Sequence, residues 1–345
     1  MPAATPMNSS DVVGVGSPPR IVLVGTGGTI AGSAAVGDGV SYQAGVVSIA
    51  DLVGAVPGLD RIAALSYEQF AQIDSCDMTL ERQLALARRV AELQARDDVD
   101  AVVVTHGTDT LEETAYLLHL VLPSAKPAVL VGAMRPADAP GADGPANLLA
   151  AVRTAACSES TGRGTLVVLG GAIHSARDLA KRHTSRVDAF ASAHGPIGEV
   201  TDHCVTYYQQ PARRFGFASA VGLAGLPESL PPVETVYGRA GLPASILQAY
   251  VASGACGLVY VGHGGGNIPL DLRDALAQIA AAGVPVVRTS RVGEGVVARD
   301  GAVPDSALGL IAGDDLTPPK ARILLALALT KTTDSAHIQE IFDTH

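Results

Sequence analysis

The sequence is poor in charged and aromatic residues and contains no tryptophan. Charged residues make up 17% of the 345 positions, aromatic residues 4% and hydrophobic residues 48%. Chains that stay disordered combine low hydropathy with high net charge, so this composition excludes wholesale disorder. Glycine (38) and proline (21) follow no fixed period, which excludes a collagen-like chain. The length predicts two domains, or one large domain with an added lobe.

Positive charge is also scarce, with 24 basic against 34 acidic residues and a formal net charge of −10. An acidic surface repels phosphate backbones, so we expect no nucleic acid partner. No apolar run reaches the roughly 18 to 20 residues that cross a bilayer. The longest clean run, residues 323–329, is far shorter. We therefore expect a soluble protein that does not insert into membranes.

The first 19 residues lack a positively charged segment followed by an apolar one, which is the pattern of a secretion signal. We expect residues 1–19 to form a disordered lead-in and the protein to be cytoplasmic.

Cysteine and histidine lack the spacings that hold metals. The four cysteines form no C-x-x-C pair, which argues against a zinc ribbon or a redox dithiol and predicts free thiols. The nine histidines form no H-x-H or H-x-x-x-H pattern, so we predict no metal.

What the sequence does contain is an alternation of short apolar runs with amphipathic segments. The runs have the length and branching of strands buried on both faces, and they lie at residues 20–25, 101–105, 128–131, 165–169, 257–261 and 284–288. Helices are predicted to start near Ser48, Thr79, Thr110, Pro145, Asp271 and Pro319. This alternation predicts an α/β fold with a parallel sheet covered on both faces.

The alternation lapses at residues 211–232, a loop-like stretch longer than compact domains normally carry. We place a linker at residues 211–231, between an N-terminal domain at 20–210 and a C-terminal domain at 232–345. No repeat of fixed period is evident, so a solenoid or propeller is not expected.

A glycine-rich loop at residues 25–32 follows the first strand. A dinucleotide fingerprint needs glycine or alanine where Ile30 stands, and no Gly-Lys-Ser/Thr supplies a phosphate-binding loop. What remains is a turn with two hydroxyls, Thr26 and Thr29, and free backbone N–H groups, as a nucleophile beside an oxyanion pocket requires. The alternative is a tight turn without chemistry.

A second loop, at residues 105–114, follows the strand at 101–105. Thr108 supplies a hydroxyl, Asp109 a carboxylate, and a helix starts there, so an amino group and a carboxylate could both be held. Alternatively, Asp109 only caps the helix. Lys181, after a later strand, would ease deprotonation of Thr108 if the two were neighbours. Alternatively, Lys181 is surface charge.

These segments resemble the bacterial-type L-asparaginase family. TGGTIAG at 26–32 and THGTDTLEETAYLL at 105–118 are similar to its two signature segments. The likeness continues in family order from about residue 20 to 345, through DSCDM at 74–78, VGAMRP at 131–136, ADGPANL at 142–148, ARDLAKRHT at 176–184 and PPKARILLALALT at 318–330. The resemblance implies a larger flavodoxin-like parallel-sheet domain at the N-terminus and a smaller C-terminal α/β domain.

The resemblance also implies a reaction, in which the side-chain amide of L-asparagine is hydrolysed to L-aspartate and ammonia through a threonine acyl-enzyme, without a cofactor. Thr29 matches the primary nucleophile and Tyr42 the tyrosine that helps to activate it. Thr108 would help to deliver water, and Lys181 would tune Thr108. The substrate contacts implied are Asp109 for the ammonium group, Ser75 for the α-carboxylate and backbone at Ala133 for the leaving amide.

Three positions depart from the family pattern. Cys76 stands where a glutamine usually contacts the substrate amino group, and Gly265 and Ala302 stand where an asparagine and a glutamate usually reach a neighbouring subunit's site. Asn267 and Glu294 are nearby candidates to replace them. The family implies a homo-oligomer, a dimer or usually a tetramer, with shared active sites. Alternatives are a glutaminase-asparaginase, an amidase acting on a larger partner, or a non-catalytic amino-acid sensor.

Overall fold

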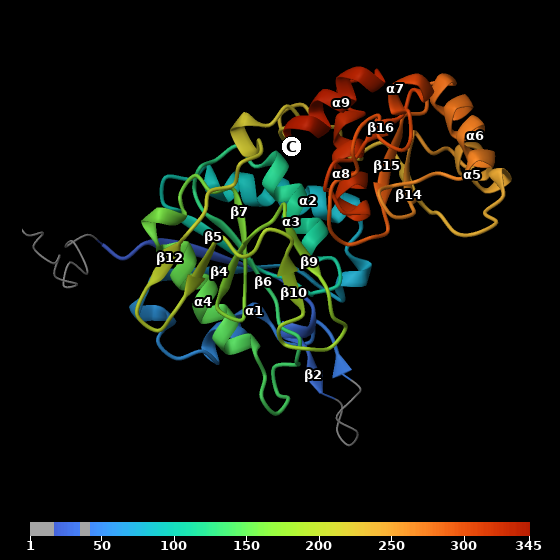
Figure 1. Ribbon diagram of the computed structural model, residues 1–345. Coiled ribbons are helices and arrows are strands. Elements are labelled where there is room, and N and C mark those ends of the chain that lie inside the picture. Colours follow the sequence, from blue (N-terminus) through green and yellow to red (C-terminus); the bar gives the residue numbers. More distant parts are fainter. Residues whose placement is uncertain (1–16, 35–41) are drawn as a thin grey trace, which may run out of the picture.

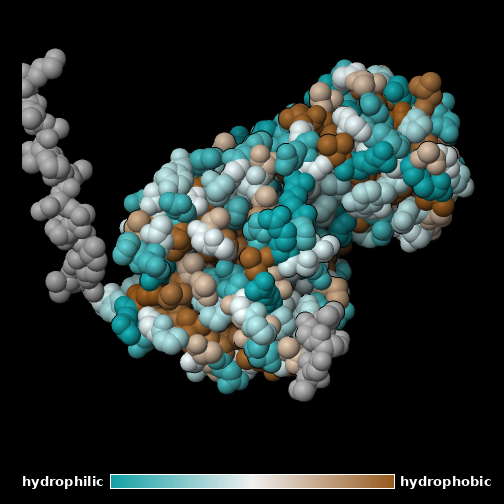
Figure 2. All heavy atoms as spheres, turned by 60° about the horizontal axis from the view of Figure 1, so that its bottom comes forward, coloured by the Kyte–Doolittle hydropathy of each residue, from teal (hydrophilic) through white to brown (hydrophobic). Residues whose placement is uncertain are grey.

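The computed structural model describes residues 17–34 and 42–345. It has a larger N-terminal lobe and a smaller C-terminal lobe, each with its own sheet and helices (Figure 1). Figure 2 shows the smaller lobe projecting from the larger one. The predicted α/β fold with two domains is confirmed. Most of the predicted disordered lead-in falls outside the described residues.

The larger sheet has eight strands in the order β12-β11-β8-β7-β6-β5-β1-β4. They are β1 (Arg20–Gly27), β4 (Ala64–Ile73), β5 (Ala101–Thr105), β6 (Ala128–Val131), β7 (Thr165–Leu169), β8 (Ala172–Ser175), β11 (Gly198–Val200) and β12 (Val205–Tyr207). The five strands from β4 to β7 are parallel, and their chain order is second, first, third, fourth, fifth. That is the flavodoxin-like order, whose ligands bind where the order reverses, between β1 and β5.

Helices cover both faces of this sheet, as predicted. Alternate strand residues point to opposite faces. Val22 and Val102 share an apolar cluster with α2 (Leu80–Gln94) and α3 (Leu111–Val121). Leu23 and Val103 share another with α1 (Ile49–Gly54) and α4 (Gly144–Ala156). The caps also form as expected, because Ser48 Oγ accepts from Asp51 N and Thr79 Oγ1 accepts from Arg82 N.

The smaller lobe holds a parallel sheet of four strands, β13 (Val233–Tyr237), β14 (Gly257–Gly262), β15 (Val286–Ser290) and β16 (Ile311–Ala312). On one face lie α5 (Ala244–Ala252) and α6 (Leu270–Ala281), beside the short α7 (Asp305–Leu308). On the other face lie α8 (Pro318–Ala328) and α9 (Ser335–Thr344), in the same apolar cluster as α3. Helix α8 therefore joins the cores of the two lobes.

The segment predicted as a linker, residues 211–231, is anchored to the larger lobe at several buried positions. Val221, Leu226 and Leu230 are buried in the cluster that contains α3, and Leu223 N donates to Val121 O. It also contains the 3-10 turn η5 (Gly216–Ala218). The exact domain boundaries at 210 and 232 stay a prediction.

Some elements differ from the sequence analysis. Strand β4 was not predicted because it is an edge strand with mixed polar and apolar residues. The edge beyond β7 is antiparallel and built from strands of three or four residues, too short to produce a pattern. In the part of the chain that the structure describes, no helix is both long enough and apolar enough to cross a membrane.

Candidate active site

The two predicted loops meet at the reversal point of the sheet. The loop after β1 leads into the 3-10 turn η1 (Thr29–Ala31), and the loop after β5 leads into α3. Gly28 has a φ of 78°, and a Cβ built on it would lie 2.1 Å from Gly107 Cα. Only glycine therefore allows the two loops to approach so closely.

Thr29 is brought beside Tyr42. Strand β2 (Ser33–Ala34) pairs with β3 (Tyr42–Gln43), and this hairpin returns Tyr42 toward η1. Thr29 Oγ1 lies 2.9 Å from Tyr42 Oη. Thr29 is 7% exposed and Tyr42 is 43% exposed, so the pair lies between the protein interior and solvent. The contact is of the kind in which a hydroxyl can pass its proton to a neighbour.

Thr108, Asp109 and Lys181 form a second group. Lys181 lies in β9 (Leu179–Lys181), which pairs with β10 (Phe190–Ser192). Its Nζ donates to Thr108 Oγ1 at 2.9 Å and to Asp109 Oδ1 at 2.6 Å. Lys181 is more than 70 positions from Thr108 and Asp109 in the sequence, but the fold brings it beside both. The structure thereby decides whether Lys181 is a neighbour of Thr108 or only a surface charge. It is not an isolated surface charge.

Asp109 does not cap the helix. The N-cap of α3 is Thr110, with no side-chain cap hydrogen bond, while the Asp109 carboxylate faces Lys181 and is 58% exposed. The capping alternative is therefore wrong. The side chain remains accessible to a ligand, although it already has a protein cation as a partner.

Ser75 connects the 3-10 turn η3 (Ser75–Asp77) to the second loop. Its Oγ accepts from Asp109 N at 3.1 Å, and its carbonyl accepts from Thr110 Oγ1 at 2.7 Å. Because the Ser75 hydroxyl accepts there, its own hydrogen is free to be donated to an anion.

Cys76 is exposed beside Ser75. The nearby Asp74 carboxylate raises the pKa of the Cys76 thiol above its usual range, with smaller contributions from desolvation and Asp77. The thiol is therefore neutral at physiological pH, which disfavours it as a nucleophile.

The loop after β6 places Ala133 next to the glycine-rich loop. Ala133 is fully buried, and the Asp143 carboxylate accepts from Met134 N and Arg135 N at 2.9 to 3.2 Å. Asn147 Nδ2 donates to Gly132 O at 3.0 Å. Asp143 and Asn147 thus hold this loop. Both residues belong to the ADGPANL motif at 142–148, from which no role for them was predicted.

His106 is a third residue to which no role was assigned from the sequence. It is fully buried, its Nδ1 lies 2.7 Å from Gly107 O and its Nε2 lies 3.0 Å from Thr114 Oγ1. Burial lowers the pKa of His106 to about 4, so the ring is neutral and holds the loop by hydrogen bonds alone. A histidine between an apolar strand and a glycine was the available signal.

The C-terminal-lobe candidates are less closely gathered. Asn267 belongs to a tight turn, where its N donates to His263 O at 2.6 Å, and a Cβ added at Gly265 would meet open space. Ala302 O accepts from Arg273 in its own lobe. Glu294 lies 3.6 Å from Arg182 and lines the same cleft as Lys181. Of the four candidates Asn267, Gly265, Ala302 and Glu294, only Glu294 lies near Lys181 within the same chain.

Among the described residues, no group of three or more His, Cys, Asp or Glu side chains could hold a metal ion. The groups that the structure gathers at the two loops are the hydroxyls of Thr29, Tyr42 and Thr108, the Lys181 ammonium and the Asp109 carboxylate.

Comparisons with known proteins agree with this geometry. The model of the N-terminal asparaginase domain matches residues 20–213, and that of the glutaminase/asparaginase C-terminal domain matches residues 232–342. A glutaminase-asparaginase of Pseudomonas fluorescens biotype A is 40% identical over 325 residues, covering 94% of this chain and 90% of its own length. A Haemophilus influenzae protein named "probable L-asparaginase periplasmic" is 42% identical over 326 residues, covering 94% and 93%.

A solved structure from Campylobacter jejuni, titled "probable cytoplasmic L-asparaginase", superimposes with a TM-score of 0.90 at 42% identity. The match covers 95% of this chain and all of that one. With both domain models matched in order and relatives aligned over nearly their full length, this chain belongs to the asparaginase family.

Proposed function

We propose that this protein hydrolyses the side-chain amide of L-asparagine to L-aspartate and ammonia, with Thr29 as the nucleophile. The observation that carries the proposal is that two loops meet at one end of the sheet, one with Thr29 beside Tyr42 and the other with Thr108 beside Lys181. A hydrolysis in two steps needs one hydroxyl to attack and a second group to direct water.

In the first step, Thr29 Oγ1 bonds to the side-chain carbonyl carbon of asparagine, and the carbon–nitrogen bond breaks. The hydroxyl proton passes through Tyr42 Oη to the nitrogen, which leaves as ammonia. Backbone N–H groups of the glycine-rich loop stabilise the negative oxygen that forms on the way. In the second step, water held by Thr108 attacks the ester carbon. The ester bond breaks, a proton returns to Thr29, and aspartate leaves.

Substrate recognition is assigned to the groups around these hydroxyls. The Asp109 carboxylate attracts the substrate ammonium, and Ser75 donates its free hydrogen to the α-carboxylate. Backbone at Ala133 contacts the leaving amide. Cys76 stands at the amino end of the substrate but offers only a weak thiol contact.

We propose asparagine as the preferred substrate, although the Pseudomonas fluorescens relative is named for both amides. One methylene by itself discriminates by only about 1 to 3 kcal/mol, so a strong preference depends on polar groups. With Cys76, Gly265 and Ala302 at these positions, the site lacks three polar side chains that would keep the longer glutamine aligned at Thr29. Asparagine has fewer rotatable bonds to immobilise, so its alignment depends less on those polar side chains.

The protein is further proposed to be a homo-oligomer in which C-terminal-lobe loops complete a neighbouring subunit's site. In support, Tyr237 is 60% and Val292 is 52% exposed, and both line the cleft that contains Lys181. Large apolar side chains gathered beside a site are typical of a subunit contact. Light scattering that finds a fully active monomer would contradict this. A cytoplasmic location is also proposed. The names of two relatives give different locations, cytoplasmic for the Campylobacter jejuni protein and periplasmic for the Haemophilus influenzae protein. Cell fractionation would decide between these two locations.

The test of the proposed function is release of ammonia by the purified protein, measured separately with asparagine and glutamine. We expect turnover with a kcat/KM at least about tenfold higher for asparagine. Equal values would favour the glutaminase-asparaginase alternative. Binding of asparagine without ammonia release would favour a sensor.

A further inference from the structure

Strand β9, which carries Lys181, has a strand partner on only one of its edges among the described residues. It pairs with β10, and Asp178 O, just before β9, accepts from Ala193 N on that side. Successive carbonyls of a strand point in opposite directions, so the carbonyls of Arg177 and Leu179 face the other edge. Groups on that edge need partners from elsewhere when they are buried.

Lys320 of α8 supplies the partners for both carbonyls. Its Nζ donates to Arg177 O at 2.7 Å and also to Leu179 O. The residue is 1% exposed, and its ammonium lies 5.8 Å from the centre of the Tyr116 ring. A buried ammonium is costly unless its donors are satisfied, so Lys320 holds β9 firmly where it is.

Glu112 of α3 occupies the next position on the same edge. Its largely buried carboxylate lies beside the main chain at Lys181 and interacts with the charge of Lys320. On this edge β9 therefore faces side chains of two helices instead of a second neighbouring strand, and Lys320 supplies its hydrogen bonds. Glu112 comes from the larger lobe and Lys320 from the smaller lobe.

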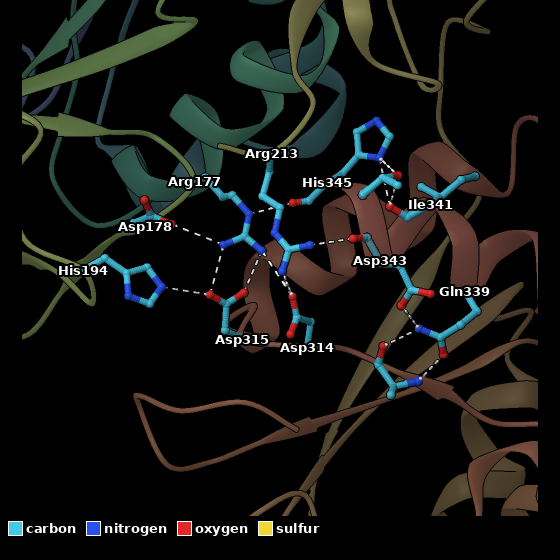
Figure 3. Close-up of polar contacts among 12 residues, drawn as sticks. Arg177, Asp178, His194, Arg213, Asp314, Asp315, Gln339, Ile341, Asp343 and His345 are labelled. Atoms are coloured by element: carbon cyan, nitrogen blue, oxygen red, sulfur yellow. Dashed lines mark hydrogen bonds and ion pairs between the residues drawn. The ribbon is translucent and has the colours of Figure 1, made fainter. Parts of the chain in front are cut away.

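The segment before β9 is tied to the smaller lobe as well. The Arg177 guanidinium, in Figure 3, donates to Asp315 at 2.6 Å and to the carbonyl of the C-terminal residue His345 at 2.6 Å. Main chain and side chain at position 177 are therefore both held by the C-terminal lobe, four residues before Lys181.

We propose that Lys320 is a positioning residue for the reaction. It fixes the main chain of β9 and thereby keeps Lys181 Nζ within hydrogen-bonding distance of Thr108 Oγ1. The smaller lobe thus sets the position of Lys181 in its own chain. This role is separate from any contribution of its loops to the site of another subunit. This inference rests on the proposed function, in which Lys181 tunes Thr108.

The test compares Lys320→Met with Arg322→Met. Arg322 lies on the same helix and pairs with Glu113 of α3 at 3.0 Å, so both variants remove a cation that joins α8 to the larger lobe. Only Lys320 contacts β9. Crystal structures should show Lys181 Nζ beyond about 3.5 Å from Thr108 Oγ1 in Lys320→Met and unchanged in Arg322→Met. An unchanged distance in Lys320→Met overturns the proposal, whether or not the protein proves to be an asparaginase.

Kinetics give the second readout. A misplacement of about 1 Å can cost on the order of 100-fold, so kcat for asparagine should fall at least about tenfold in Lys320→Met while KM stays within about threefold. Combined with Lys181→Met, the substitution at 320 should add nearly nothing, because it acts through Lys181. Additive losses would mean a general structural role and would overturn the proposal.

If Lys320→Met does not fold, Lys320→Gln is crystallised and assayed instead. Its side chain is one atom shorter than that of lysine, so we expect it to lose at least one of the two carbonyls and to displace Lys181 Nζ, and an unchanged distance would again overturn the proposal. If the unsubstituted protein shows no turnover, the proposed function is refuted but the positioning role of Lys320 is not. That role is tested by the distance from Lys181 Nζ to Thr108 Oγ1 in the crystal structures, which needs no activity assay.

Discussion

At the scale of single residues, the chemistry depends on what each side chain touches. A threonine hydroxyl is a weak nucleophile in water, and Thr29 differs from other threonines through the Tyr42 hydroxyl 2.9 Å away. Asp109 also has a defined neighbour, because Lys181 Nζ donates to one of its oxygens at 2.6 Å while the carboxylate stays 58% exposed to a ligand. The residue pattern alone predicted these residues as candidates, and only the family resemblance implied that Thr29 lies beside Tyr42 and Thr108 beside Lys181.

Replacing Asp109 with alanine should weaken asparagine recognition severely. The change removes the only carboxylate assigned to the substrate ammonium, so we expect kcat/KM to fall by about 100-fold or more. Thermal unfolding should change little, because Asp109 caps no helix and its ion pair with Lys181 is exposed on the carboxylate side. Asp77→Ala, which removes another carboxylate near the site, is the control and should stay within about threefold of the parent. Normal kinetics with a clearly lower melting temperature would speak against the assignment.

Restoring glutamine at position 76 should strengthen substrate binding. The side-chain amide of glutamine can accept a hydrogen bond from the substrate amino group, whereas the neutral thiol of Cys76 is a poor acceptor. In Cys76→Gln we expect KM to fall several-fold for both amides, with at least as large a gain for glutamine as for asparagine. The measurement is steady-state kinetics, with Cys76→Ser as the control. If the lower KM comes from the glutamine amide, Cys76→Ser should not show it; if it comes only from loss of the sulfur atom, both variants should. An unchanged KM would mean that the substrate does not reach this position.

At the scale of secondary-structure elements, the sequence was most informative where burial is complete. Strands β5, β6 and β7 were predicted with their observed bounds because every residue in them is buried and all but Thr105 and Thr165 are apolar. The pairing of β9 with β10 was not predicted, and the approach of Lys181 to Thr108 was expected only from the family resemblance. Both result from long-range packing, to which periodicity is insensitive.

Two loops of the smaller lobe depend on one buried ion pair. The Arg288 guanidinium pairs with Asp305 and also donates to the carbonyls of Gly265 at 3.0 Å and Ala298 at 2.9 Å. Both ion-pair side chains are at most 1% exposed. The segments that carry Gly265 and Ala302 are therefore joined to the same cation.

Arg288→Met should lower the free energy of unfolding by about 3 to 5 kcal/mol, because it leaves the Asp305 carboxylate buried without a counter-charge. Urea denaturation of Arg273→Met provides the comparison. Arg273 also donates to main-chain carbonyls near these loops but pairs with no carboxylate, so its loss should stay near about 1 kcal/mol. Equal losses in the two variants would show that the ion pair contributes nothing special.

At the scale of the whole molecule, charged groups join the lobes beside their shared apolar core. Arg177 of the larger lobe contacts Asp315, Asp178 and the C-terminal residue, and His194 Nε2 lies 3.0 Å from Asp315 (Figure 3). Burial alone would raise the pKa of Asp315, but the hydrogen bond and charge of Arg177 outweigh it and hold that pKa well below its usual range.

This lowered pKa predicts how stability depends on pH. A carboxyl with a lower pKa in the folded than in the unfolded chain stabilises the fold above its unfolded pKa, and the contribution is lost as pH falls through the folded value. Asp315→Asn should therefore cost about 3 kcal/mol at neutral pH. In urea denaturation the difference from the parent should persist down to about pH 5 and shrink below about pH 4. A difference that is independent of pH would exclude the ionised carboxylate as its source.

The central claim is that asparagine is hydrolysed through a bond to Thr29, and the most direct measurement is the rate of ammonia and aspartate release by Thr29→Ala beside the parent. The parent should release the two products in equal amounts. Thr29→Ala should fold normally and lose nearly all turnover, because no neighbouring group can form the ester in its place. Ser33→Ala, which removes a hydroxyl from the adjacent hairpin, should retain its rate. If Thr29→Ala stays within about tenfold of the parent, a barrier difference of only about 1.4 kcal/mol, Thr29 is not the nucleophile.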